Sequence, residues 1–171
     1  FLCNNMKSTN GVERVLSQRL RLLAESGMYE VYLITYNQYG APFSFPISDK
    51  VHYIDLATRY IERCSYHGMF QYIDRYVCRK AFIRLFHRCI EDIKPHVVTC
   101  VDMHLADLEA VISIKSDVVK VVECHCGLSA YFGDLEKIEN KYKKKRERAL
   151  KQKQIQIIGK FDRIIVMTED E

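Results

Sequence analysis

The 171-residue sequence has no hydrophobic run long enough to span a bilayer, no signal-peptide pattern at its start and no internal repeat. The absence of long hydrophobic runs and of repeats argues against a membrane-spanning protein and a repeat array. Hydrophobic residues make up 48% and charged residues 28%, as in a soluble globular protein. Because no linker divides the chain, we predict one domain over 1–171 with a sizeable core. The chain opens in an apolar stretch without Met, so we expect further residues upstream.

Disulfide bonds are not expected, because the Cys residues are odd in number and lie mostly within apolar runs. Reduced thiols of this kind are typical of a cytoplasmic protein. The seven Cys stand at positions 3, 64, 78, 89, 100, 124 and 126.

The net charge of +4 is concentrated in one stretch. The range 141–153 holds eight Lys or Arg and one Glu, a local charge of +7, which leaves −3 for the rest of the chain. The basicity is therefore a patch and not a general property of the surface. The patch includes Lys141, Lys143, Lys144, Lys145, Arg146 and Arg148.

Apolar runs of strand type alternate with helical patterns along the chain. Strands are predicted over 1–3, 30–36, 51–56, 96–101, 118–124 and 163–167, and helices around 12–25, before Pro95, around 105–112 and over about 135–153. This alternation predicts a Rossmann-like, three-layer α/β/α domain with a mainly parallel sheet and right-handed crossovers. The Val-rich runs 96–101 and 118–124 predict two adjacent, buried, parallel strands.

The turn after the first predicted strand is a candidate ligand site. Its sequence, Ser8-Thr9-Asn10-Gly11, supplies N-cap residue types and a residue without Cβ just before an amphipathic helix. The free amides and the dipole of a helix start can hold a phosphate or carboxylate, here at Asn10, Gly11 and Val12. The alternative is an ordinary capped turn, since one Gly is a weak signal.

His125 follows the strand 118–124, at the edge of a parallel sheet where ligands usually bind. A His there can donate to a developing phosphate charge or orient a hydroxyl; the alternative is a loop His packed between two Cys. The triplet Cys124-His125-Cys126 also suggests zinc. The Cys spacing is too short for a usual tetrahedral site, however, so we predict neither a metal nor a cofactor.

Five segments in order resemble the first half of retaining glycosyltransferases with the GT-B fold, of the large bacterial family that builds lipopolysaccharide and capsule. They read GVERVLSQRLRLLAESGMYEVYLITY, SDKVHYIDL, KPHVVTCV, VVECH and RIIVMTEDE. The family usually has Gly-Gly in its first loop, where this chain has Asn10-Gly11. Glu13 and Arg14 match the family's Glu-Arg pair, and His125 matches a cleft His.

The resemblance implies a specific division of labour. In that family, the N-terminal domain mainly holds the acceptor, and a C-terminal domain, absent from 1–171, holds the nucleotide-sugar. The chain is thus expected to be the acceptor half of a transferase that adds sugar to a glycan or lipid-linked acceptor in cell-surface polysaccharide synthesis. His125 is then the candidate catalytic residue, and Asn10, Gly11, Val12 and His125 are the candidate substrate contacts. The fragment alone is expected to be inactive.

The basic stretch leaves two further interpretations open. Its apolar residues Leu135, Ile138, Tyr142 and Ala149 share a helical face that we expect to pack on the sheet. The outward charges could bind anionic lipid, which would place a cytoplasmic protein at the inner membrane face. They could also bind nucleic acid in a Rossmann-like binding module of a different class, which the resemblance disfavours. A dinucleotide-dependent dehydrogenase is disfavoured, because its cofactor-binding loop requires the motif Gly-x-Gly-x-x-Gly, which this chain lacks.

Overall fold

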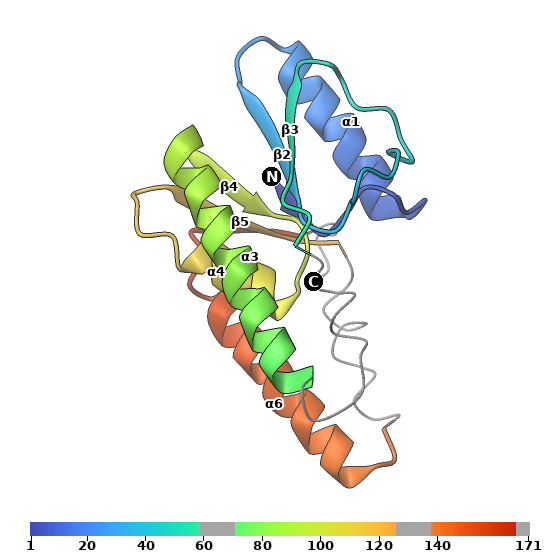
Figure 1. The fold of residues 1–171 in the computed structure, drawn as a ribbon, viewed down its shortest axis with the longest axis vertical. Coiled ribbons are helices and arrows are strands. Elements are labelled where there is room, and N and C mark those ends of the chain that lie inside the picture. Colours follow the sequence, from blue (N-terminus) through green and yellow to red (C-terminus); the bar gives the residue numbers. More distant parts are fainter. Residues whose placement is uncertain (59–70, 126–137, 167–171) are drawn as a thin grey trace. The chain divides into compact units, whose positions relative to one another are not determined.

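A computed structural model describes residues 1–58, 71–125 and 138–166 (Figure 1). The chain divides into two compact units, Phe1–Lys94 and Pro95–Glu171, which are described one at a time. Strands and helices alternate along the chain, except that the strand Val51–Asp55 follows the strand Val31–Thr35 with no helix between them. All strand pairs in the two units run parallel, which confirms the predicted Rossmann-like α/β fold class.

The first unit carries three parallel strands in the order β3-β2-β1. The register places Leu2 opposite Ile34 and Val31 opposite Val51. Because parallel neighbours end at the same edge, the residues that follow these strands gather there. The elements are β1 (Leu2–Cys3), α1 (Gly11–Glu25), β2 (Val31–Thr35), β3 (Val51–Asp55) and α3 (Gln71–Ile93).

Aromatic packing forms the centre of the first core. The rings of Tyr36 and Phe82 lie 4.5 Å apart between centroids, and Phe86 lies 6.2 Å from Phe82. All three side chains are fully buried. Phe82 and Phe86 are one turn apart on α3, so they belong to one face of that helix. Helix α1 buries Leu16, Leu20 and Ala24 at the same helical spacing.

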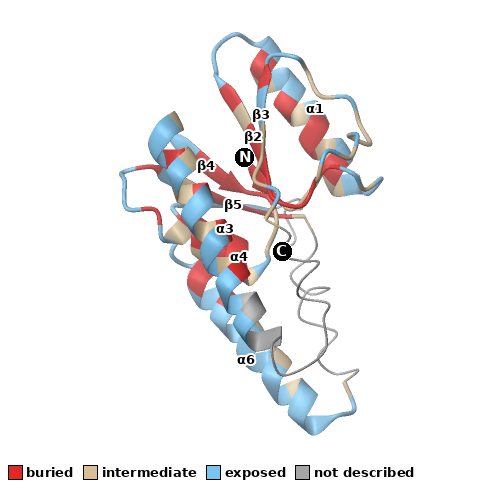
Figure 2. Cartoon of the chain, viewed as in Figure 1, coloured by how far each residue is buried: buried red, intermediate tan, exposed pale blue. Residues whose placement is uncertain are grey.

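The second unit carries three parallel strands in the order β4-β5-β6. The predicted pair 96–101 and 118–124 is confirmed as β4 beside β5, with Val98 opposite Lys120 and Cys100 opposite Val122. Figure 2 shows both strands as mainly buried. The elements are β4 (Val97–Cys100), α4 (Leu105–Ile112), β5 (Val119–Cys124), α6 (Lys141–Ile158) and β6 (Arg163–Val166).

Helix α6 corrects the predicted packing of the basic stretch. Tyr142 is 86% exposed and Ala149 is exposed, so the expected face does not pack on the sheet. The buried residues are Gln154, Ile157 and Ile158, all in the last turns. The prediction was wrong because Lys and Arg also occupy that face, whereas the apolar Ile pair near the end has no charged neighbour in sequence. Leu135 lies outside the described residues.

Candidate functional site

Side chains at the carboxyl edge of the first unit form a connected polar network. Asn37 Nδ2 donates to Asn4 Oδ1 at 2.9 Å, and the Tyr39 hydroxyl donates to Asn37 Oδ1. Lys7 Nζ donates to the Asn37 carbonyl at 2.9 Å and lies 5.3 Å from the Tyr39 ring centroid, a cation–π distance. Gln38 is buried and accepts from Met6 N at 2.7 Å. These bonds join the loops after β1 and β2.

Asp55 ends β3 and anchors the loop backbone in this network. Its Oδ2 accepts from Tyr39 N at 2.8 Å, and its Oδ1 accepts from Ala57 N at 3.1 Å. Both of these residues have positive φ, 52° and 45°, a conformation that L-residues rarely adopt and that such bonds help to hold. Asp55 is therefore a structural acceptor for two backbone amides of this edge.

The turn into α1 has the predicted backbone but lacks part of the predicted cap. Asn10 is the N-cap, with φ −80° and ψ 168°, yet its side chain makes no capping bond. Gly11 begins the helix, and a Cβ built there meets no atom within 4 Å. The fold therefore does not require Gly at this position, while Asn10 and Gly11 are exposed and Val12 is half-buried. The side chain of Asn10 is thus available to a ligand.

Glu13 changes the chemistry expected of this turn. Its side chain lies in the first turn of α1 and is buried, and its Oε2 has no hydrogen-bond partner within the described ranges. Arg14, its neighbour in the predicted pair, is exposed. A carboxylate beside the helix start disfavours a second anion there. The turn therefore suits a ligand that donates hydrogen bonds, such as a hydroxyl, better than the phosphate first considered.

The most specific polar pair of the second unit lies at the end of β5. Glu123 Oε2 is 2.9 Å from His125 Nε2, and the two side chains are only 3% and 8% exposed. The other ring nitrogen, His125 Nδ1, is buried and has no partner among the residues that the structure describes. Buried polar atoms are nearly always paired in native proteins. His125 Nδ1, as a buried ring nitrogen without a partner among the described residues, is therefore a candidate ligand contact.

The pair could have been found from the sequence. Residues two apart on a strand point to the same face, so Glu-x-His at the end of a buried strand predicts that the two side chains meet. Our sequence reasoning treated Glu123 only as part of a strand. The burial of the His125 side chain predicts that replacing it with Ala costs stability, because Glu123 would lose a buried partner.

Other acids and thiols at this edge have structural contacts. Cys100 Sγ lies 3.0 Å from the Asp102 carbonyl, and Asp102 is half-buried. Cys124 is buried, while Cys126 lies outside the described residues. Across the described ranges, no group of three His, Cys, Asp or Glu is placed to hold a metal ion.

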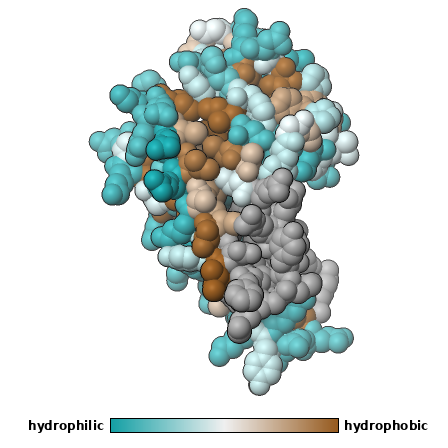
Figure 3. Space-filling view, viewed as in Figure 1, coloured by the Kyte–Doolittle hydropathy of each residue, from teal (hydrophilic) through white to brown (hydrophobic). Residues whose placement is uncertain are grey.

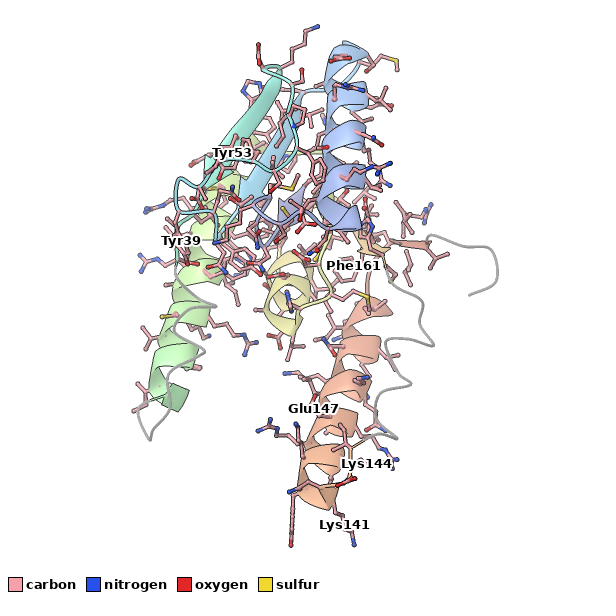
Figure 4. The ribbon with its side chains drawn as sticks, turned by 90° about the vertical axis from the view of Figure 1, so that its right-hand side faces the viewer. Tyr39, Tyr53, Lys141, Lys144, Glu147 and Phe161 are labelled. Atoms are coloured by element: carbon pink, nitrogen blue, oxygen red, sulfur yellow. The ribbon has the colours of Figure 1, made fainter. Side chains whose placement is uncertain are left out.

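The first half of α6 presents the predicted basic surface, residues 141–148 (Figure 4). Asn140 caps this helix, accepting from Tyr142 N and Lys143 N at 3.0 Å each. Figure 3 shows a largely hydrophilic surface around its first turns. Near the other end, Lys153 pairs with Glu109 at 2.9 Å, and Gln154 donates to the Met103 carbonyl at 2.8 Å. Lys144 is half-buried; the exposed cations are Lys141, Lys143, Lys145, Arg146 and Arg148.

Comparisons with known proteins leave the family open. No protein-family model matches the sequence, and no curated protein matches it significantly. Among the described helices, none is both long and apolar enough to cross a membrane. Gly11 and His125 belong to different units. That both residues contact one substrate therefore stays a prediction.

Proposed function

We propose that this chain is the acceptor-binding half of a retaining glycosyltransferase. Its substrate would be a glycan or lipid-linked acceptor in cell-surface polysaccharide synthesis. The observation that carries the proposal is the buried Glu123–His125 pair at the carboxyl end of β5, in which His125 Nδ1 has no partner among the described residues. Ligands of parallel α/β sheets bind beyond that edge, and the resemblance expects a cleft His at this position.

The first unit supports the same substrate class independently. Glu13 Oε2 is a buried acceptor without a donor in the described ranges, and it follows three residues after Asn10, whose amide side chain is exposed. Sugars present many hydroxyl donors, so an open carboxylate oxygen suits them. Nucleotide-sugar binding would come from a second half outside 1–171, as the resemblance implies.

A transfer assay tests this proposal. The chain should be expressed together with the reading frame that follows it, and separately as residues 1–171. Each protein is incubated with membrane extract and a panel of radiolabelled nucleotide-sugars. The longer protein is expected to label a glycan or lipid-linked product, and the shorter one is not. Failure of the longer protein with every donor, or transfer by residues 1–171 alone, would contradict the proposal.

The exposed cations of α6 favour a secondary role in membrane association. Each basic residue near an anionic bilayer contributes about 1 kcal/mol to the binding free energy. The first half of α6 carries five exposed basic residues. Flotation with phosphatidylserine vesicles should retain the protein at low salt and release it at high salt. Replacing Lys143, Lys145 and Arg148 with Gln should abolish flotation, whereas Lys50→Gln, far along the sequence and exposed, should not. Equal binding to neutral vesicles would contradict this role.

A further inference from the structure

We propose that Glu123 is a positioning residue that holds the His125 ring as its Nε2–H tautomer. His125 Nδ1 then accepts a hydrogen bond from a hydroxyl of a neutral sugar acceptor. The identity of the ligand rests on the proposed function, whereas the role of Glu123 rests on the geometry of β5 alone. The inference selects between the two chemistries first considered for His125: it favours orienting a hydroxyl over donating to a phosphate.

The strand fixes Glu123 firmly. Glu123 is opposite Ile165 on β6, while the preceding residue, Val122, is opposite Cys100 on β4. A strand paired on both sides has little freedom to move. His125 follows directly at the end of β5, two residues after Glu123, so the two side chains emerge on the same side.

The carboxylate decides which ring nitrogen carries the proton. An ionised Glu only accepts hydrogen bonds, so the nitrogen that faces it at 2.9 Å must donate. In a neutral imidazole, the proton then resides on Nε2 and leaves a lone pair on Nδ1. The hydrogen-bond partner of one ring nitrogen therefore determines whether the other nitrogen donates or accepts a hydrogen bond. Burial of both side chains strengthens the bond, because the surroundings are less polar than water.

The open nitrogen selects the ligand by its chemistry. Nδ1 is buried and lacks a partner within the described ranges, so a ligand group that satisfies it must be a donor. Sugar hydroxyls and amide N–H groups meet this requirement. A phosphate oxygen does not, because it would face a lone pair and lie close to the Glu123 charge.

The tautomer can be measured directly on the 171-residue chain labelled with nitrogen-15. Long-range nitrogen–proton correlation spectra distinguish protonated from unprotonated ring nitrogens. The His125 signals are assigned by their loss in His125→Gln. We expect one form in the wild type, with Nε2 protonated and Nδ1 not. A protonated Nδ1 would overturn the proposal, whether in the other tautomer or in a doubly protonated ring.

The substitution Glu123→Gln tests whether Glu123 determines the tautomer of His125. The Gln amide can accept or donate, so a second tautomer with Nδ1 protonated should appear. An unchanged tautomer in a variant with a native-like amide spectrum would overturn the role of Glu123; should the variant not fold, the wild-type spectrum alone decides. His52 is the matched control, because its Glu30 partner is 3.6 Å away and the two side chains are 56% and 68% exposed. His52 should show averaged tautomers.

The anion alternative is tested with inorganic phosphate as the probe. We expect no change in the His125 Nδ1 signal on addition of phosphate. Protonation of Nδ1 on addition would overturn the proposal. These spectra need no transfer activity, so their outcome is separable from that of the transfer assay. A longer protein that transfers no sugar would contradict only the proposed function, and a protonated Nδ1 in an active enzyme would contradict only this inference.

Discussion

The hydroxyl groups of Thr35 and Tyr53 lie 2.9 Å apart across the neighbouring strands β2 and β3. Asp55 Oδ1 is 3.4 Å from the same Thr35 oxygen. Partial burial is the main cause that raises the pKa of Tyr53; the Asp55 charge adds to it, and the Thr35 bond opposes it. Thr35 therefore connects the Tyr53 phenol, whose pKa is raised, to the Asp55 carboxylate.

This link predicts a loss of stability at high pH. The pKa of Tyr53 is higher in the folded state than in the unfolded state, so the folded chain holds this proton more tightly. The resulting stabilisation is complete below the unfolded pKa of about 10 and is lost as pH rises through the folded value. Melting temperatures measured from about pH 9 to 11 should fall less steeply in Tyr53→Phe than in the wild type. Tyr29→Phe, at an exposed site, should keep the wild-type slope.

Two Asn residues at helix starts should respond differently to substitution by Ala. The Asn140 side chain accepts two amide hydrogen bonds at the start of α6, so Asn140→Ala should cost about 1 kcal/mol. Asn10 makes no such bond at α1, so Asn10→Ala should cost less than about 0.5 kcal/mol. Urea unfolding gives both values. Equal losses at the two sites would contradict the difference in capping.

The aromatic core should be the most sensitive part of the first unit. Phe82 is fully buried against Tyr36 and Phe86, so Phe82→Ala should cost about 3–5 kcal/mol through lost burial and a residual cavity. Leu85 lies on the same helix and is 39% exposed. Leu85→Ala should therefore cost about 1 kcal/mol or less. Chemical denaturation of the two variants compares them directly, and a larger loss at Leu85 would refute the assignment of the core.

Asp55 should hold the loop that follows β2. Asp55→Ala removes acceptors for Tyr39 N and Ala57 N, both at residues with positive φ, and should cost about 1–3 kcal/mol. Asp49→Ala, at an exposed site before β3, is the matched control and should be nearly neutral. Hydrogen exchange at Tyr39 N should accelerate only in the first variant. Unchanged protection of that amide would argue against the anchoring role.

The strands were the most predictable part of this fold. The runs around β4 and β5 are rich in Val and contain only single polar residues such as Thr99, Lys120 and Glu123, which is typical of strands covered on both faces, so their burial and pairing could be predicted from the sequence. Gly27 was also predictable as the residue past α1, and its φ of 69° explains why Gly stands there. These features depend on local sequence, and so a pattern suffices.

The candidate site was less predictable because it depends on contacts between loops. The bond from Tyr39 N to Asp55 joins two separate segments, and no spacing rule connects them. His125 was identified as a candidate, but its dependence on Glu123 was missed although the two-residue spacing contained it. The face of α6 was mispredicted because a helix dominated by Lys and Arg has a weak apolar stripe.

Helix α6 consists of two halves that are stabilised by different forces. Its last turns are held by side-chain burial, whereas the first half relies on the Asn140 cap and on the helix propensity of its own residues. Pairs such as Lys141 and Lys145 stand four residues apart, so like charges repel along that half. Dissolved salt screens this repulsion, and a polyanion bound there would neutralise it. Ionic strength should therefore regulate how far α6 extends from its anchored end towards Asn140.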